Sequence, residues 1–90
     1  MARIRFQLRQ AGASTVSLAG DFNGWSAAAH PMEGQGEGLW SLEVDLPPGC
    51  HEYKFFVDGS QWWNDPETPK VPNLWGTENS YVEVREEPPP

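Results

Sequence analysis

Two adjacent tryptophans, Trp62 and Trp63, lie between a turn and an Asp-Pro break in the segment DGSQWWNDP. Successive side chains of an extended strand point to opposite faces, so one core cannot bury both rings if this segment is extended. We expect one indole to anchor the core and the other to face solvent or a ligand. Alternation alone leaves open which of the two is the exposed one.

Three aspartates offer the carboxylates that a glycosidase would need, but their setting favours a structural role. Asp58-Gly59 and Asp65-Pro66 are turn dipeptides, and Asp21 lies in a glycine-rich loop. The chain has no nucleophile motif, no phosphate-binding glycine loop and no histidines at metal-ligand spacing. The sequence therefore predicts no catalytic residue, no metal site and no cofactor, and we do not expect an enzyme.

The composition restricts the partners and the location. The 90 residues carry a formal net charge of −7, whereas nucleic acids and anionic membranes attract clustered Lys and Arg. We therefore expect a neutral ligand or a protein partner, with no nucleic acid and no membrane. The single cysteine, Cys50, cannot form an intrachain disulfide, and neither a membrane-spanning run nor a signal peptide is evident. These features favour a cytoplasmic protein.

Apolar and polar residues alternate with a period of two in five segments, which is typical of half-buried strands: 3–10, 15–20, 39–46, 51–57 and 80–86. Pro47-Pro48-Gly49 has a length suited to an antiparallel hairpin between the third and fourth of them. The pattern predicts an all-β, antiparallel β-sandwich in a single domain over residues 1–85, with long loops at 21–38 and 64–78. The Pro-rich end, 86–90, is predicted to be a flexible tail.

Four motifs occur in an order that resembles a known family: VSLAGDFNGW, LPPGCHEYKFFVDG, QWWNDP and GTENSYVEV. Over residues 14–85 the chain is similar to carbohydrate-binding module family 48, which includes the glycogen-binding domain of the AMP-activated protein kinase β-subunit and the N-terminal domains of isoamylases. The resemblance implies an immunoglobulin-like β-sandwich. It also implies an α-1,4-glucan ligand, either a polysaccharide such as glycogen or starch or a maltooligosaccharide.

The resemblance assigns roles to five residues. Trp25 and Trp62 would stack on sugar rings, while Lys54 and Asn79 would hydrogen-bond sugar hydroxyls. Trp75 stands where the family often has an aliphatic residue, and it would add a third stacking surface or fill a local pocket. The turn before QWW is one residue longer than the usual family spacing, so Trp63 stays an alternative to Trp62.

Two functions compete at this point. The first is a non-catalytic glucan-binding module that localises a partner or a larger chain. The alternative is an immunoglobulin-like interaction domain that docks on a glycan-processing enzyme or a kinase partner without sugar affinity of its own. Retention of Trp25, Trp62, Lys54 and Asn79 together favours binding.

Overall fold

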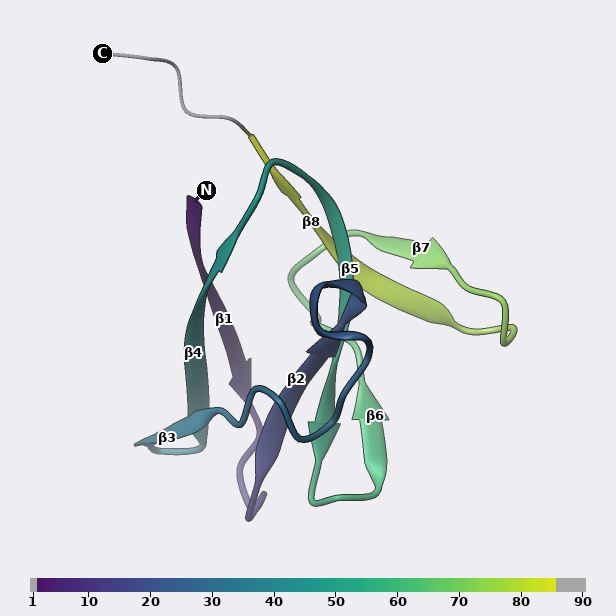
Figure 1. Ribbon diagram of the computed structural model, residues 1–90. Coiled ribbons are helices and arrows are strands. Elements are labelled where there is room, and N and C mark those ends of the chain that lie inside the picture. The colour runs from purple at the N-terminus through teal and green to yellow at the C-terminus, as the bar shows by residue number, and fades with distance from the viewer. Residues whose placement is uncertain (1, 86–90) are drawn as a thin grey trace.

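A three-stranded sheet and a five-stranded sheet make up the fold (Figure 1), and all their pairings are antiparallel. The structure is a computed structural model that describes residues 2–85, so the tail predicted at 86–90 lies outside the described residues. In the three-stranded sheet the central strand is β4 (Leu39–Leu46), and its neighbours are β1 (Ala2–Arg9) and β3 (Glu33–Gly36). The domain boundary at residue 85 stays a prediction.

The five-stranded sheet is organised around β5 (Gly49–Val57). One edge of β5 pairs with β2 (Val16–Gly20), and the other pairs first with β8 (Glu78–Val84) and then with β6 (Gln61–Trp63). β7 (Lys70–Pro72) adds an edge strand to β8. A single turn of 3-10 helix, η1 (Asp21–Asn23), follows β2. The predicted all-β, immunoglobulin-like antiparallel sandwich is confirmed.

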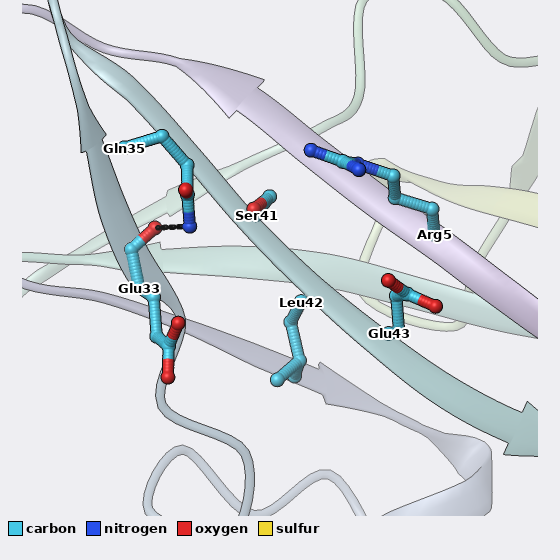
Figure 2. Close-up of a pocket in the computed structure, with 6 residues that line it drawn as sticks. All are labelled: Arg5, Glu33, Gln35, Ser41, Leu42 and Glu43. Atoms are coloured by element: carbon cyan, nitrogen blue, oxygen red, sulfur yellow. Dashed lines mark hydrogen bonds between the residues drawn. The ribbon is translucent and has the colours of Figure 1, made fainter.

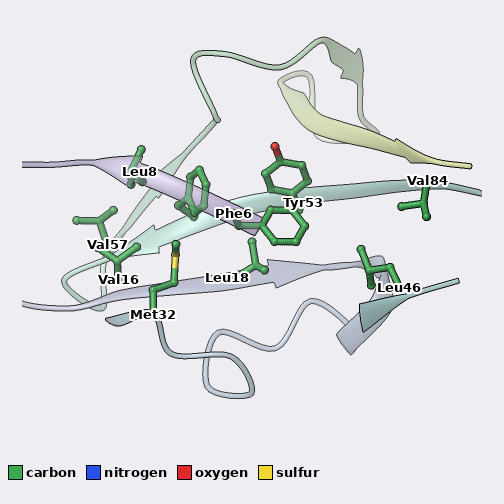
Figure 3. Packing of buried hydrophobic residues seen from close by; sticks show 10 residues of the cluster. Phe6, Leu8, Val16, Leu18, Met32, Leu46, Tyr53, Val57 and Val84 are labelled. Carbon is green, nitrogen blue, oxygen red and sulfur yellow. The ribbon is translucent and has the colours of Figure 1, made fainter. Parts of the chain in front are cut away.

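The hydrophobic core lies between the two sheets (Figure 3). On β5 the alternation places Tyr53, Phe55 and Val57 inward, and their accessible surface is almost entirely lost. Complete burial of one such side chain contributes about 1.5–3 kcal/mol to folding. The same inward face includes residues from the other strands and from the loop before β3: Phe6, Leu8, Val16, Leu18, Met32, Leu46 and Val84. From Tyr53 onward the odd-numbered side chains of β5 pack in the core, so its even-numbered side chains point outward and form an outer surface.

A buried hydrogen-bonded pair fixes the segment after β6 to the centre of the sheet. The Tyr53 hydroxyl donates to Asp65 Oδ2 at 2.8 Å, and the backbone N–H of Asp65 donates to Ser80 Oγ at 2.7 Å. Asp65 Oδ1 accepts the backbone N–H of Glu67 at 2.9 Å. Burial raises the pKa of the Tyr53 phenol, because the phenolate would lose its hydration. Asp65 thus has the structural role expected of it.

Two expectations about connectivity are corrected. Pro47-Pro48-Gly49 does not close a hairpin, because β4 and β5 belong to different sheets and the chain crosses from one sheet to the other at this point (Figure 1). The prolines have no N–H to extend a ladder, and Gly49 has a positive φ of 134°, which redirects the chain. The predicted loops 21–38 and 64–78 each contain a short edge strand, β3 and β7 respectively. Strands of this length are too short to show an alternation pattern.

Candidate functional site: an aromatic groove on the outer face of the larger sheet

A groove of about 1040 Å³ lies over the outward-facing residues of β5 and β8. It brings together all the residues that the sequence assigned to a site, namely Trp25, Lys54, Trp62, Trp75 and Asn79. One loop, two strands and the 3-10 turn that follows β2 supply the remaining lining residues: Asp21, Glu52, Pro72, Asn73, Leu74 and Thr77. Residues separated by more than fifty positions in sequence therefore form one continuous surface.

Trp62 is held over the sheet by the hairpin of β5 and β6. The register pairs it with Phe56, and the two rings pack with centroids 4.5 Å apart at an angle of 43°. Asp58 and Gly59 both have positive φ at the turn, as a tight hairpin requires. The side chain of Trp62 keeps 49% of its surface exposed. The Phe56 contact therefore supports one part of the indole and leaves another part free to stack.

Trp25 follows η1 and has a φ of 59°, a left-handed conformation that costs a non-glycine residue about 1–2 kcal/mol. The side chain of Asn23 holds the loop in this shape. Its Oδ1 accepts the backbone N–H groups of Gly20 at 3.0 Å and Ser26 at 3.2 Å, and its Nδ2 donates to Leu18 O at 3.0 Å. The indole of Trp25 is 37% exposed and faces the groove. The backbone strain is thus located where an aromatic ring is presented.

Trp75 lies at the tip of the β7–β8 hairpin, beside Leu74. The two side chains are 87% and 99% exposed, the highest values among the large hydrophobic residues that the structure describes. Of the two roles left open for Trp75, filling a local pocket is wrong, because a ring with this exposure fills nothing in the free protein. The geometry is that of an additional apolar surface at one rim of the groove.

Lys54 and Asn79 differ in how accessible they are. Lys54 lies on the outer face of β5, and its Nζ donates to Thr77 Oγ1 at 3.4 Å. Asn79 is only 8% exposed, and its amide donates to Glu52 Oε1 at 3.1 Å and accepts from Asn73 Nδ2 at 2.9 Å. The Asn79 amide therefore forms part of the groove floor, with one N–H and one lone pair left unused.

Trp63 corrects the expectation that one of the paired tryptophans anchors the core. It is 41% exposed, and its Nε1 donates to Gln61 Oε1 at 3.0 Å rather than to a core acceptor. Its register partner, Phe55, is fully buried, so Trp63 does point to the inner side of the sheet. However, β6 is a three-residue edge strand whose ladder partner is β5 alone, and the inner side of such an edge stays uncovered. The groove contains Trp62 and not Trp63.

A smaller hollow of about 310 Å³ lies on the outer face of the three-stranded sheet (Figure 2). Its lining is mostly charged or polar and includes Arg5, Glu33, Gln35 and Glu43, with Leu42 as its apolar member. Figure 2 shows these side chains on three neighbouring strands, with the Gln35 amide donating to Glu33 O. Because the lining has no aromatic ring, this hollow lacks a stacking surface.

Several polar residues that surround Lys54 and Asn79 were not predicted from the sequence. Glu52 could have been found, since it lies two positions before Lys54 on the same outward face of β5. Asn73 and Thr77 belong to a loop, where no periodic pattern shows which side chains turn inward. Asp21 also lines the groove, and its Oδ2 accepts the backbone N–H of Glu52 at 3.1 Å.

Within residues 2–85, no helix is long and apolar enough to cross a membrane. The same part of the chain has no group of three or more His, Cys, Asp or Glu side chains placed to hold a metal ion.

The sandwich with an exposed groove of tryptophans and hydrogen-bonding side chains defines a ligand-binding β-sandwich domain suited to a sugar chain. Comparison with known proteins identifies its family. A family described as the glycogen recognition site of AMP-activated protein kinase matches residues 2–89. The chain belongs to this family, so the resemblance to carbohydrate-binding modules is confirmed.

Individual relatives agree with this assignment. The chain is 42% identical to 5'-AMP-activated protein kinase subunit beta-1 of Bos taurus over 74 residues, which are 82% of this chain and 26% of the relative. Subunit beta-2 of Homo sapiens is 40% identical over 74 residues, again 82% of this chain and 26% of the relative. The chain thus spans about a quarter of the length of the curated relatives it matches.

Proposed function

We propose that this domain binds α-1,4-glucan chains in the aromatic groove without acting on them chemically. Glycogen, starch and maltooligosaccharides share a glucose ring with an apolar face of C–H groups and a rim of hydroxyls. A flat indole covers the apolar face, and amide, hydroxyl and ammonium groups match the rim.

The observation that carries this proposal is the convergence of Trp25, Trp62 and Trp75 on one groove. All three indoles are exposed, although their burial would otherwise be favourable. Between them lie side chains with hydrogen-bonding atoms near the surface, including Lys54 and Asn79. Stacking surfaces that flank a polar floor suit a neutral, hydroxyl-rich ligand, and the net charge of −7 agrees with a ligand that is not anionic.

The expected affinity is modest. If each stacked ring removes on the order of 100 Å² of apolar surface from water, one contact contributes about 2.5 kcal/mol. Two or three contacts contribute about 5–7.5 kcal/mol, and a few hydrogen bonds to the hydroxyls add about 1 kcal/mol each. Lost translational and rotational freedom costs several kcal/mol, so we expect a Kd on the order of 1 mM. Binding of this strength becomes useful on a polymer, where neighbouring sites raise the effective concentration.

Tryptophan fluorescence titration with β-cyclodextrin or maltoheptaose tests the proposal. Trp62→Ala should weaken binding by about 70-fold, which is the loss of about 2.5 kcal/mol, and Trp25→Ala should have a comparable effect. Trp63→Ala is the matched control, because this neighbouring indole is also exposed but lies outside the groove. Absence of binding by the folded native domain at millimolar sugar refutes the proposal, and so does equal weakening by all three substitutions.

The competing function is a docking domain for a protein partner. It is favoured by the names of the relatives, which are subunits of a kinase and are about four times as long as the matched segment. We propose that a catalytic partner protein is recruited to glucan through this domain, which accommodates both functions. If the groove variants leave glucan binding unchanged but abolish co-purification with such a partner, docking alone is the function.

Two further parts of the proposal concern catalysis and location. The carboxylates of Asp21, Asp58 and Asp65 all accept backbone hydrogen bonds, which supports a structural use for them rather than a catalytic one. Release of reducing sugar from maltoheptaose by the pure domain would contradict the absence of catalysis.

A cytoplasmic location is tested by fluorescence microscopy of the tagged full-length protein, and a secreted product would contradict it.

A further inference from the structure

Asn73 opens the five-residue connection between β7 and β8, and its side chain shapes this connection. The side-chain Oδ1 of Asn73 accepts the backbone N–H of Trp75 at 3.0 Å and that of Thr77 at 3.1 Å. The backbone N–H of Asn73 donates to Thr77 O at 3.0 Å. Gly76 supplies a positive φ of 81° within the loop. The backbone position of Trp75 is therefore set by Asn73, although the indole itself is almost fully exposed.

The other end of the same side chain orients the groove floor. Asn73 Nδ2 donates to Asn79 Oδ1 at 2.9 Å and to Thr77 Oγ1 at 2.8 Å. Asn79 Nδ2 in turn donates to Glu52 Oε1 at 3.1 Å. A chain of hydrogen bonds thus runs from the loop backbone through two amides to a carboxylate on β5.

The direction of every bond in this chain is determined. Backbone N–H groups can only donate, so the atom of Asn73 that faces them must be its oxygen. Its nitrogen then faces Asn79, whose oxygen accepts and whose nitrogen is left to face Glu52. An ionised carboxylate can only accept, so the far end agrees with the near end. Neither amide can be reversed without opposing two like partners.

Asn73 has no hydrogen-bonding capacity left for a ligand. Both of its N–H groups and both lone pairs of its oxygen are already engaged within the loop and with Asn79. Asn79, by contrast, retains one N–H and one lone pair, and it lies beside Lys54 and Glu52 in the groove. Asn73 is therefore suited to act on a bound sugar through its neighbours rather than by contact.

We propose that Asn73 is the positioning residue of the glucan groove, which sets the Trp75 stacking surface and the Asn79 amide at the same time. This inference rests on the proposed function. It makes recognition of the ring face and recognition of the hydroxyls depend on one side chain.

The inference is tested with Asn73→Asp and Asn73→Ala. An aspartate keeps an acceptor for the backbone N–H groups of Trp75 and Thr77, so the loop should retain its fold. It places a second oxygen against Asn79, whose amide must then serve two carboxylates, the introduced one and that of Glu52. We expect Asn73→Asp to melt within a few degrees of the native domain and yet bind maltoheptaose about tenfold more weakly. Asn73→Ala, which loses both functions, should bind at least as weakly.

The matched control is Asn64→Ala. Asn64 also holds β8 with its side chain, because Nδ2 donates to Glu78 O at 2.9 Å and Oδ1 accepts from Ser80 Oγ at 2.9 Å, but it lies outside the groove. This substitution should lower the melting temperature and leave the affinity for maltoheptaose unchanged. In the free domain, the side-chain amide resonances of Asn79 should shift in Asn73→Asp and stay in place in Asn64→Ala.

The possible failures are distinguishable. If the native domain does not bind maltoheptaose, the proposed function and this inference both fall. If the native domain binds and Trp62→Ala weakens it, but Asn73→Asp and Asn73→Ala bind as the native domain does, only the role of Asn73 is refuted. Unchanged Asn79 amide resonances in Asn73→Asp would refute it as well.

Discussion

Substitution of Asn23 by alanine should disorganise the loop that presents Trp25 without removing any surface that a sugar could contact. The side chain makes three hydrogen bonds to the backbone, with Gly20 N–H, Ser26 N–H and Leu18 O. With about 1 kcal/mol for each partly buried hydrogen bond, the free energy of unfolding should fall by about 3 kcal/mol. For a domain of this size the melting temperature should drop by about 12–24 °C.

The loss of stability should be accompanied by a loss of affinity, because the left-handed conformation of Trp25 would no longer be enforced. A double-mutant cycle with Trp25→Ala separates the two effects, measured by glucan titration of folded protein well below the melting temperature. If Asn23 acts through Trp25, then Asn23→Ala should cost little additional affinity once Trp25 is already alanine.

Two results would refute this reasoning. Additive losses of affinity in the double variant would show that Asn23 influences binding by another route. A melting temperature of Asn23→Ala within about 2 °C of the native value would show that its hydrogen bonds do not hold the loop. Asn64→Ala serves as the comparison, because it also removes hydrogen bonds to the chain but leaves the Trp25 loop untouched.

Three other predictions concern ionisable groups. Burial raises the pKa of Tyr53, so the folded state keeps a proton that the unfolded chain releases above about pH 10. The free energy of unfolding should therefore decline above that pH. In alkaline denaturation curves, Tyr53→Phe should remove this decline. Slight desolvation and nearby carboxylates, that of Glu52 first among them, raise the pKa of the Cys50 thiol. Its reaction with a thiol reagent at about pH 8 should therefore be slower than that of free cysteine, and a faster reaction would contradict this. Asn23 Nδ2 faces His30 Nδ1 at 2.8 Å and donates, so the neutral ring should carry its proton on Nε2, and a protonated Nδ1 in nitrogen NMR spectra would contradict this.

The strands that build the core could be predicted from the sequence because each has one solvent-exposed face and one buried face, which gives an alternation of polar and apolar residues. On β5, Tyr53, Phe55 and Val57 alternate with Lys54 and Phe56, and the structure places the first three in the core. The predicted hairpin between β4 and β5 was wrong because the arrangement of strands in the whole fold determines this connection. The crossing at Pro47-Pro48 depends on which sheet each strand joins, and a local turn signal carries no information about that.

The residues of the candidate site that lie in family motifs could be predicted, Lys54 and Asn79 included, whereas the polar loop residues around those two could not. Trp25 and Trp62 belong to motifs that the chain shares with a family, so their positions could be transferred. Alternation predicted that one of the two adjacent tryptophans would anchor the core, and neither does. Alternation describes the direction of a side chain but not whether anything lies opposite it, and Trp63 stays 41% exposed. Asn73 was overlooked because its importance arises from a chain of bonds across a loop, and no spacing rule encodes such a chain.

The exposure of Trp75 at the hairpin tip has a consequence for how a polymer would arrive and leave. With 87% of this indole exposed, and 49% of Trp62, the groove has no roof in the free domain. A long glucan could settle in sideways at any internal stretch, with no need to thread a free end. Binding and dissociation of the glucan would then be fast. On a branched granule the domain would dissociate and rebind repeatedly, and the total time it stays there would depend on the density of glucan chains around it.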